Sequence, residues 1–446
     1  MAQAVADKMV DSKPPGITRI AVRGFKSIAE ECEIEIRPLT VLAGANSSGK
    51  SSMMQPLLMM KQTLEAPYDP GALLINGPNV RFTSAEQFLS RLSGRDKNNN
   101  SFTVRIECSK SAAYGTESIA IANTFSKTPG KYIELVETLY KGDYGKMRLT
   151  PEMSHEEIDS QFSDKFRPLL SFPNQPAHKW RVNRHRCFFD LLNDAAHPDT
   201  FPQSVSVGSL FGDDILDTIH LLWLRGNPER AYAAAATGPR FPGVFQNYVA
   251  SLIHHWHETK PELIGTLTTA LQTLGLSSAI KADRHNDAQI ELRVSRTMRN
   301  SRDLVNIADV GIGVSQVLPV LVALLAAQPG QLVYIEQPEL HLHPRAQSAL
   351  AGILADAAKQ GVRVVVETHS DLLLLGIQTR VAEGDLPPEL VKLHWFRRRG
   401  NGVTEVISAD LDETGAFGDW PEDFAEVDLK AQSRYLDAAE LRLIER

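Results

Sequence analysis

The sequence predicts an α/β protein with a mixed sheet, an antiparallel β subdomain and a helical insertion. A strand-like segment at 32–44 runs directly into a Gly-rich loop and a helix-forming stretch at 49–65. Strand and helix patterns alternate again between 332 and 370, which is typical of a parallel sheet. Between 101 and 149 short alternating segments follow one another without a helix, which favours antiparallel strands.

The first strands are expected at 17–25 and within 32–44, paired as neighbours. The antiparallel subdomain is expected to use strands at 102–108, 117–123 and 131–140, each with β-branched or aromatic residues. Together these segments form the N-terminal part of the fold.

The later part of the chain is expected to complete the sheet. A strand at 288–296 should resume it, strands at 332–336 and 362–370 should flank a helix at about 345–360, and 391–408 should form a hairpin. The predicted division of the chain is 17–150, a helical insertion at 151–285, 286–380, and a C-terminal hairpin with an aromatic tail at 381–446.

Composition sets broad limits on function. The 446 residues carry a net charge of −7, which argues against a protein coated with nucleic acid, because affinity for phosphates comes from clustered Lys and Arg. The three cysteines are isolated in sequence, so neither a disulfide framework nor a CxxC metal site is indicated. The leader at 1–16 lacks an apolar core, and no apolar run is long enough for a membrane segment. We therefore expect a cytoplasmic protein.

The segment 44-GANSSGKS-51 matches the phosphate-binding P-loop pattern GxxxxGK[ST] in full. Gly44 and Gly49 allow the backbone to turn its N–H groups toward phosphates, Lys50 reaches the β- and γ-oxygens, and the Ser51 hydroxyl ligates Mg²⁺. The predicted cofactors are ATP and Mg²⁺. The complete set of expected cradle residues is Gly44, Asn46, Ser47, Ser48, Gly49, Lys50, Ser51 and Ser52.

A second strand, 332-LVYIE-336, ends in a carboxylate. In P-loop enzymes such a strand-end acid holds the Mg²⁺ water shell, so Glu336 is predicted to be a metal-site residue together with Ser51. The alternative is a buried strand that simply ends in a solvated acid, which would give the same sequence pattern. The P-loop upstream favours the metal role for Glu336.

The motifs SSGKSS, IEQPELHLHP and ETHSD resemble those of the AAA-type ATPases in the OLD, RecF and SMC branch of the ABC superclass. The resemblance covers roughly 17–110 and 286–375. It implies an ABC-type P-loop ATPase whose two heads face each other, with each nucleotide sandwiched between the P-loop of one head and a signature motif of the other. It also implies that His369 is the switch histidine that senses the γ-phosphate.

The segment 309-DVGIGVSQVLP-319 stands at the place of the family's signature motif. Gly311 occupies a position where a serine is common. The resemblance implies that Gly311, Gly313, Ser315 and Gln316 approach the nucleotide of the partner head; a glycine-rich helix start without such a contact is the alternative.

Gln337 departs from the family pattern, because ABC-type enzymes usually carry a catalytic glutamate after the Mg²⁺ acid. An amide can orient water but is a much poorer base than a carboxylate. Glu339, two residues on, could turn its carboxylate toward the same water. We therefore predict slow hydrolysis in which Gln337 and Glu339 share the task.

Three further patterns have mostly structural readings. Glu339, His341 and His343 could hold zinc, but they lack a fourth ligand at a recognised spacing. His254 and His257 could share a helix face, although ordinary helix packing is favoured. The arginines at 397–399 are usually a solvated turn, with DNA contact as the alternative.

The tail contains Phe417, Trp420 and Phe424, which could anchor it on the head or on a partner. The chain has no long coiled coil, and the segment after Ser370 is too short for the nuclease domain found in OLD proteins. The leading hypothesis is an ATP-driven switch that forms a homodimer or larger homo-oligomer and controls a separately encoded effector, such as a nuclease or toxin in bacterial anti-phage defence. A RecF-like DNA-binding repair ATPase and a non-hydrolysing ATP-bound scaffold are the alternatives.

Overall fold

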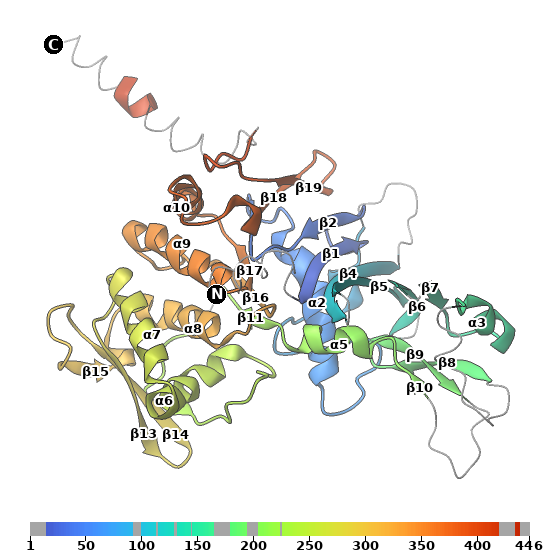
Figure 1. Ribbon diagram of the computed structural model, residues 1–446, viewed down its shortest axis with the longest axis horizontal. Coiled ribbons are helices and arrows are strands. Elements are labelled where there is room, and N and C mark those ends of the chain that lie inside the picture. Colours follow the sequence, from blue (N-terminus) through green and yellow to red (C-terminus); the bar gives the residue numbers. More distant parts are fainter. Residues whose placement is uncertain are drawn as a thin grey trace.

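A six-stranded mixed sheet forms the centre of the molecule (Figure 1). The computed structural model describes residues 15–91, 100–112, 115–128, 132–143, 145–164, 179–193, 204–223, 225–418 and 433–437. The strands of the central sheet, in spatial order, are β11 (Ile219–Leu221), β16 (Leu332–Glu336), β17 (Arg363–Glu367), β3 (Leu39–Gly44), β18 (Val391–Arg398) and β19 (Thr404–Ala409). The first five run parallel and β19 is antiparallel to β18. The mixed α/β fold predicted from the sequence is confirmed.

The central sheet separates two apolar cores. Val41 on β3 belongs to one core, whereas its neighbour Leu42 belongs to the other, because successive side chains of a strand point to opposite faces. Helices that contribute to the first core are α6 (Val249–Thr259), α7 (Pro261–Thr273), α8 (Ile312–Ala326), α9 (Pro344–Lys359) and α10 (Asp371–Ala382). Helix α2 (Lys50–Glu65) belongs to the second core. Every residue of β3, β16 and β17 is buried, as expected for parallel strands covered on both faces.

A second six-stranded sheet is antiparallel throughout and contributes to the second core. Its strands, in spatial order, are β2 (Cys32–Glu35), β1 (Gly16–Arg23), β4 (Ser101–Ala112), β5 (Gly115–Lys127), β6 (Ile133–Gly142) and β7 (Gly145–Leu149). The expected antiparallel subdomain is therefore present. The expected pairing of 17–25 with 32–44 holds only for β1 and β2, because β3 joins the central sheet. Burial explains the division: β2 alternates between buried and half-buried residues, whereas β3 is buried throughout.

The segment 151–285 is more mixed than the helical insertion expected from the sequence. It contains α3 (His155–Gln161), α5 (Ser209–Leu216), α6 and α7, together with a three-stranded sheet of order β10-β9-β8. The strands of this sheet are β8 (Trp180–His185), β9 (Phe188–Asn193) and β10 (Ser204–Val205). The segment also supplies β11, the edge strand of the central sheet. The segment expected to be a helical insertion thus reaches the edge of the central sheet.

The expectation that 288–296 resumes the central sheet is wrong. Strand β14 (Gln289–Ser295) belongs to a separate antiparallel sheet with β13 (Ile280–Asn286), β12 (Tyr232–Ala233) and β15 (Leu304–Asn306). Residues along β14 alternate in burial, which is typical of a strand with one solvated face and unlike the fully buried central strands.

The C-terminal hairpin is confirmed as β18 and β19, with its turn around Gly402. Phe417 is buried against the first core, while Trp420 and Phe424 lie outside the described residues. Within the described ranges, no helix is both long and apolar enough to cross a membrane.

Candidate nucleotide site

The P-loop connects β3 to α2 and is held in shape by close backbone contacts. Gly44 has a φ of 137°, and a Cβ added there would lie 2.1 Å from the Phe396 carbonyl oxygen of β18. Gly49 has a φ of 113°, and its Cβ would lie 2.5 Å from Thr404 Oγ1. The Thr404 hydroxyl donates a hydrogen bond to the Ser48 carbonyl (2.7 Å). Only glycine fits at 44 and 49, so the hairpin β18–β19 fixes the loop conformation.

Lys50 opens α2 and folds over the loop. Its Nζ donates hydrogen bonds to the carbonyls of Gly44 and Ala45, each 2.9 Å long. Burial lowers the pKa of Lys50, whereas the negative charges of Glu367 and Glu339 act in the opposite direction. A buried ammonium at the first turn of a helix is suited to phosphate oxygens.

Two carboxylates end adjacent parallel strands beside the loop. Glu336 on β16 and Glu367 on β17 are register partners. The Ser51 hydroxyl donates to Glu367 Oε1 (3.0 Å), and the buried Tyr334 hydroxyl donates to Glu367 Oε2 (2.8 Å). Burial raises the pKa of Glu367, and the neighbouring charge of Glu336 raises it further. Glu367 was missed in the sequence, although VVVE ends in an acid just as VYIE does.

The edge strand β11 holds Glu336. His220 Nε2 lies 3.1 Å from Glu336 Oε1, and the Trp223 backbone N–H donates to Glu336 Oε2 (3.3 Å). The His220 ring stacks on Tyr334 with centroids 5.3 Å apart. Arg225 donates to the Glu336 carbonyl (2.9 Å), and burial lowers the pKa of Arg225 to about 10. These three residues come from the segment expected to be a helical insertion, and no motif in the sequence pointed to them.

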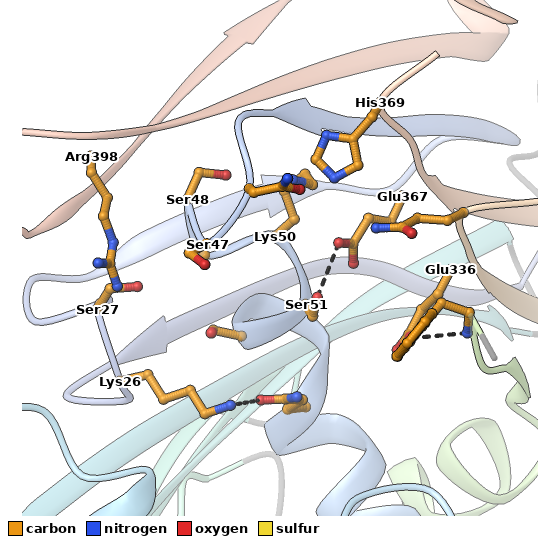
Figure 2. Close-up of a pocket in the computed structure, with 16 residues that line it drawn as sticks. Lys26, Ser27, Ser47, Ser48, Lys50, Ser51, Glu336, Glu367, His369 and Arg398 are labelled. Carbon is orange, nitrogen blue, oxygen red and sulfur yellow. Dashed lines mark hydrogen bonds between the residues drawn. The ribbon is translucent and has the colours of Figure 1, made fainter. Parts of the chain in front are cut away.

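One open pocket of about 480 Å³ brings the phosphate loop and the two strand-end carboxylates together. Figure 2 shows the P-loop side chains between Lys26 and Arg398 on one side and Glu336 and His369 on the other. The residues that line the pocket are Lys26, Ser27, Asn46, Ser47, Ser48, Gly49, Lys50, Ser51, Ser52, Gln55, Trp223, Glu336, Gln337, Glu367, His369 and Arg398. The expected cradle residues therefore share one pocket with Glu336, Gln337 and His369; only Gly44, at the strand end, does not line it.

The pocket fits Mg²⁺ and a nucleotide. A hydroxyl and two carboxylates are hard oxygen donors of the kind that Mg²⁺ prefers. The Ser48 hydroxyl is buried without a hydrogen-bond partner, so the cradle retains a free polar atom. The glycines at 44 and 49 keep the backbone open where side chains would collide with the neighbouring hairpin.

A family model described as "AAA domain, putative AbiEii toxin, Type IV TA system" matches residues 39–375. The chain belongs to this AAA family. Among curated proteins the search found no match. The predicted membership of an ABC-type P-loop ATPase family is thereby confirmed.

Three solved structures of SMC heads match this AAA-family chain. The SMC head bound to the C-winged helix domain of ScpA matches with a TM-score of 0.52 at 12% identity, over 89% of this chain and 99% of that one. An SMC head from Thermotoga maritima gives 0.40 at 10% identity, over 88% and 98% of the two chains. A Pyrococcus furiosus SMC head bound to the C-terminal domain of ScpA gives 0.46 at 12% identity, over 89% and 96%. The first of these shows an ABC-type head fold.

Two predicted residues of this AAA-family site follow β16 and β17. Gln337 has a φ of 43°, and its N–H donates to the Glu367 carbonyl (2.8 Å), which ties the two strand ends together. His369 lines the pocket, and burial together with the charge of Lys50 lowers its pKa. Both therefore stand within the pocket beside the phosphate loop.

Glu339 does not line the pocket. Its Oε1 accepts hydrogen bonds from the Thr368 hydroxyl (2.8 Å) and the His369 backbone N–H (2.9 Å). Its Oε2 is buried without a partner, and burial raises the pKa of the carboxyl. The contact with His369 connects Glu339 to the site indirectly.

The segment expected to act as a signature motif lies around the start of α8, and none of its residues lines the pocket of its own chain. Ser315 donates to the Ile312 carbonyl (2.9 Å), and the buried Gln316 donates to the Gly226 carbonyl (2.7 Å). Neither Gly311 nor Gly313 lines the pocket. Ile312 between them is 40% exposed.

The residues considered for zinc have other contacts. His343 Nδ1 accepts the Arg345 N–H at the start of α9, and His254 Nδ1 lies 3.2 Å from the Ala282 carbonyl. In the part of the chain that the structure describes, no group of three or more His, Cys, Asp or Glu side chains could hold a metal ion. Of the arginines at 397–399, Arg398 lines the nucleotide pocket, while Arg397 and Arg399 pair with Glu405.

Proposed function

We propose that this chain binds ATP with Mg²⁺ in the pocket beside the P-loop and hydrolyses it slowly. The observation that carries the proposal is the convergence of Lys50, Ser51, two strand-end carboxylates and His369 on one open pocket. Family membership supports the same reading, since the matched region contains all of these residues.

Each group has a distinct task in this proposal. The backbone N–H groups of 46–51 and the Lys50 ammonium bind phosphate oxygens, and His369 donates to or senses the terminal phosphate. Ser51 and Glu336 would hold Mg²⁺, which neutralises charge on the phosphates when bound. Lys26 and Arg398 are cations at the other side of the loop and add to the positive field of the pocket.

Slow hydrolysis follows from the groups next to the metal site. Gln337 lines the pocket and can orient a water, but an amide does not readily accept its proton. Glu339 acts through the His369 backbone, so we describe it as a positioning residue. The protein would therefore keep its nucleotide for long periods, as a timer does.

A head-to-head homodimer is part of the proposal. Gly311 and Gly313 at the start of α8 do not line their own pocket and flank the exposed Ile312, so this surface would be available to a second copy of the chain. The partner's nucleotide would bind against Gly311, Gly313 and Ser315, whereas the expectation for Gln316 is dropped, because its side chain is buried and bonded to the Gly226 carbonyl. Ordered release of the two heads after hydrolysis would then give a switch.

The switch is proposed to control a separate toxin or nuclease in bacterial defence against phage. The family description names a putative AbiEii toxin of a type IV toxin–antitoxin system and supports a setting in such systems, while a separate effector is part of our proposal. DNA is the alternative partner. A salt-dependent gain in DNA affinity on addition of ATP would favour the DNA-binding repair ATPase over control of a separate effector.

Phosphate release in the steady state tests the hydrolytic part of the proposal. Wild type is expected to turn over slowly, and Lys50→Ala to show no turnover. Glu339→Gln should retain most of the rate, because a glutamine oxygen can still accept the bonds from Thr368 and His369. A loss of more than about tenfold in Glu339→Gln would instead make Glu339 the proton acceptor. Tight ATP binding by wild type without any turnover would favour the scaffold.

Light scattering after gel filtration tests the dimer. Lys50→Ala should be monomeric with ATP, whereas the slowly hydrolysing wild type should shift toward a dimer. An ATP-independent oligomer of unchanged size in both proteins would contradict the head-to-head arrangement.

A further inference from the structure

The carboxylate that accepts a hydrogen bond from the Ser51 hydroxyl is Glu367, on β17. Ser51 Oγ donates its single hydrogen to Glu367 Oε1 over 3.0 Å, and this contact is drawn in Figure 2. A hydroxyl that donates its hydrogen in a hydrogen bond keeps its oxygen lone pairs available to a cation. The bond therefore turns the Ser51 oxygen into an oriented metal ligand.

Glu367 is itself held in place. Its second oxygen accepts the hydroxyl of Tyr334, a side chain with no exposed surface. Tyr334 lies on the neighbouring strand β16, and the ring of His220 stacks against it. A carboxylate fixed by two hydroxyl donors has little freedom to turn away, so its direction toward Ser51 is built into the two strands.

The Glu336 carboxylate has different hydrogen-bond partners from Glu367. Both of its oxygens are engaged by β11 and the residues after it, through His220 and the Trp223 N–H. It lines the pocket beside Gln337, where the reacting water would stand in the proposed function. The two register-paired acids thus face different neighbours: Glu367 faces the P-loop hydroxyl and Glu336 faces the edge strand.

We infer that Glu367 is the carboxylate that prepares Ser51 for Mg²⁺, and that the strand-end acid Glu336 serves the metal site from its other side. This inference rests on the proposed function, because it concerns the metal that accompanies ATP. It adds a metal-site residue that no sequence motif of the chain indicated. Loss of the Glu367 charge should therefore remove the contribution of Mg²⁺ to nucleotide binding, while contacts of the nucleotide with Lys50 and the loop remain.

The test compares the affinity for a fluorescent ATP analogue in Mg²⁺ with that in EDTA, in the full-length protein. Glu367→Gln should bind the analogue in EDTA as wild type does, but should lose about ten- to hundredfold of the Mg²⁺-dependent gain. Asp190→Asn is the matched control, since Asp190 is a buried carboxylate that accepts a serine hydroxyl (Ser206, 2.8 Å) outside the pocket. Asp190→Asn should keep the full Mg²⁺-dependent gain in affinity for the analogue.

Tyr334→Phe provides a second variant in case Glu367→Gln does not fold. It removes the donor to Glu367 Oε2 and leaves Glu336 without a changed contact, so a several-fold smaller Mg²⁺-dependent gain is expected. A full gain in Glu367→Gln, or in Tyr334→Phe if the first variant is unfolded, overturns the inference and leaves Glu336 as the metal acid. Absence of analogue binding in wild type overturns the proposed function itself and the inference with it.

Discussion

His220 Nε2 lies 3.1 Å from Glu336 Oε1, so an edge strand of three residues holds an acid of the candidate site. The other ring nitrogen of His220 lies 3.2 Å from Asn79 Oδ1. Both ring nitrogens of His220 thus lie close to a polar side-chain oxygen, and the ring packs flat on Tyr334, which limits the movement of Glu336.

Replacement of His220 by phenylalanine should keep the ring stack and remove the contact with Glu336. We expect kcat to fall by about ten- to hundredfold, because partners of metal-site residues have effects of this size, with little change in nucleotide affinity measured in EDTA. His255→Phe, on the exposed face of α6, is the matched control and should retain the wild-type rate. Equal rates for both variants would show that His220 only fills space.

Gln337→Glu should accelerate hydrolysis. The variant places a carboxylate where the pocket now has an amide, and general-base catalysis typically contributes a factor of about 100 or more. We expect at least a tenfold rise in kcat with ATP affinity close to wild type, measured by phosphate release. An unchanged rate in a variant that still binds ATP would mean that the amide at 337 does not limit turnover.

Gly44→Ala should destabilise the protein and weaken nucleotide binding. The left-handed φ and the approach of the Phe396 carbonyl leave no room for a methyl group, and strain of this kind costs about 1–3 kcal/mol. Gly212→Ala in α5 is the control: its Cβ meets nothing within 4 Å, and the free energy of unfolding should rise by about 0.5–1 kcal/mol. Urea titrations would compare them, and equal stabilities for the two variants would contradict the proposed constraint.

His394 should make stability depend on pH. Burial lowers its pKa from 6.5 to about 4, while Nε2 lies 2.8 Å from the Glu35 carbonyl and Nδ1 lies 2.8 Å from Ser408 Oγ. Between pH 6.5 and 4 the unfolded chain binds a proton that the folded chain does not, so this contribution is complete above pH 6.5 and is lost as the pH falls.

His394→Gln can make similar hydrogen bonds but does not titrate. When the pH is lowered from 8 to 5, the free energy of unfolding of the wild type should therefore fall by about 2 kcal/mol relative to that of this variant. Urea titrations at the two pH values measure it. A difference that stays constant would mean that His394 is readily protonated in the folded protein.

The parts of the site that could be predicted from the sequence are local. The cradle of 44–52 is a continuous motif. Glu336 ends β16 and His369 follows β17, and each strand has a central run of apolar residues, so their position at one sheet edge follows from the strand pattern. The antiparallel subdomain was also recognisable, because its strands are long and alternate in burial.

The parts that were missed depend on contacts between distant segments. Strand β11 has only three residues, too few for a periodic pattern, and it is a strand because it pairs with β16 more than a hundred positions later. His220 and Arg398 acquire their roles from such pairings. Strand β14 was assigned to the wrong sheet because a strand pattern gives the exposure of its faces but not the identity of its partner.

Calorimetric titration of the wild-type chain with ATP and Mg²⁺ tests most directly whether the pocket is a nucleotide site. We predict one nucleotide per chain for wild type, and a loss of at least tenfold in affinity for Lys50→Ala, because we propose that the buried ammonium binds phosphate oxygens in the pocket. Lack of heat with wild type, or equal affinity in Lys50→Ala, would contradict nucleotide binding at this P-loop.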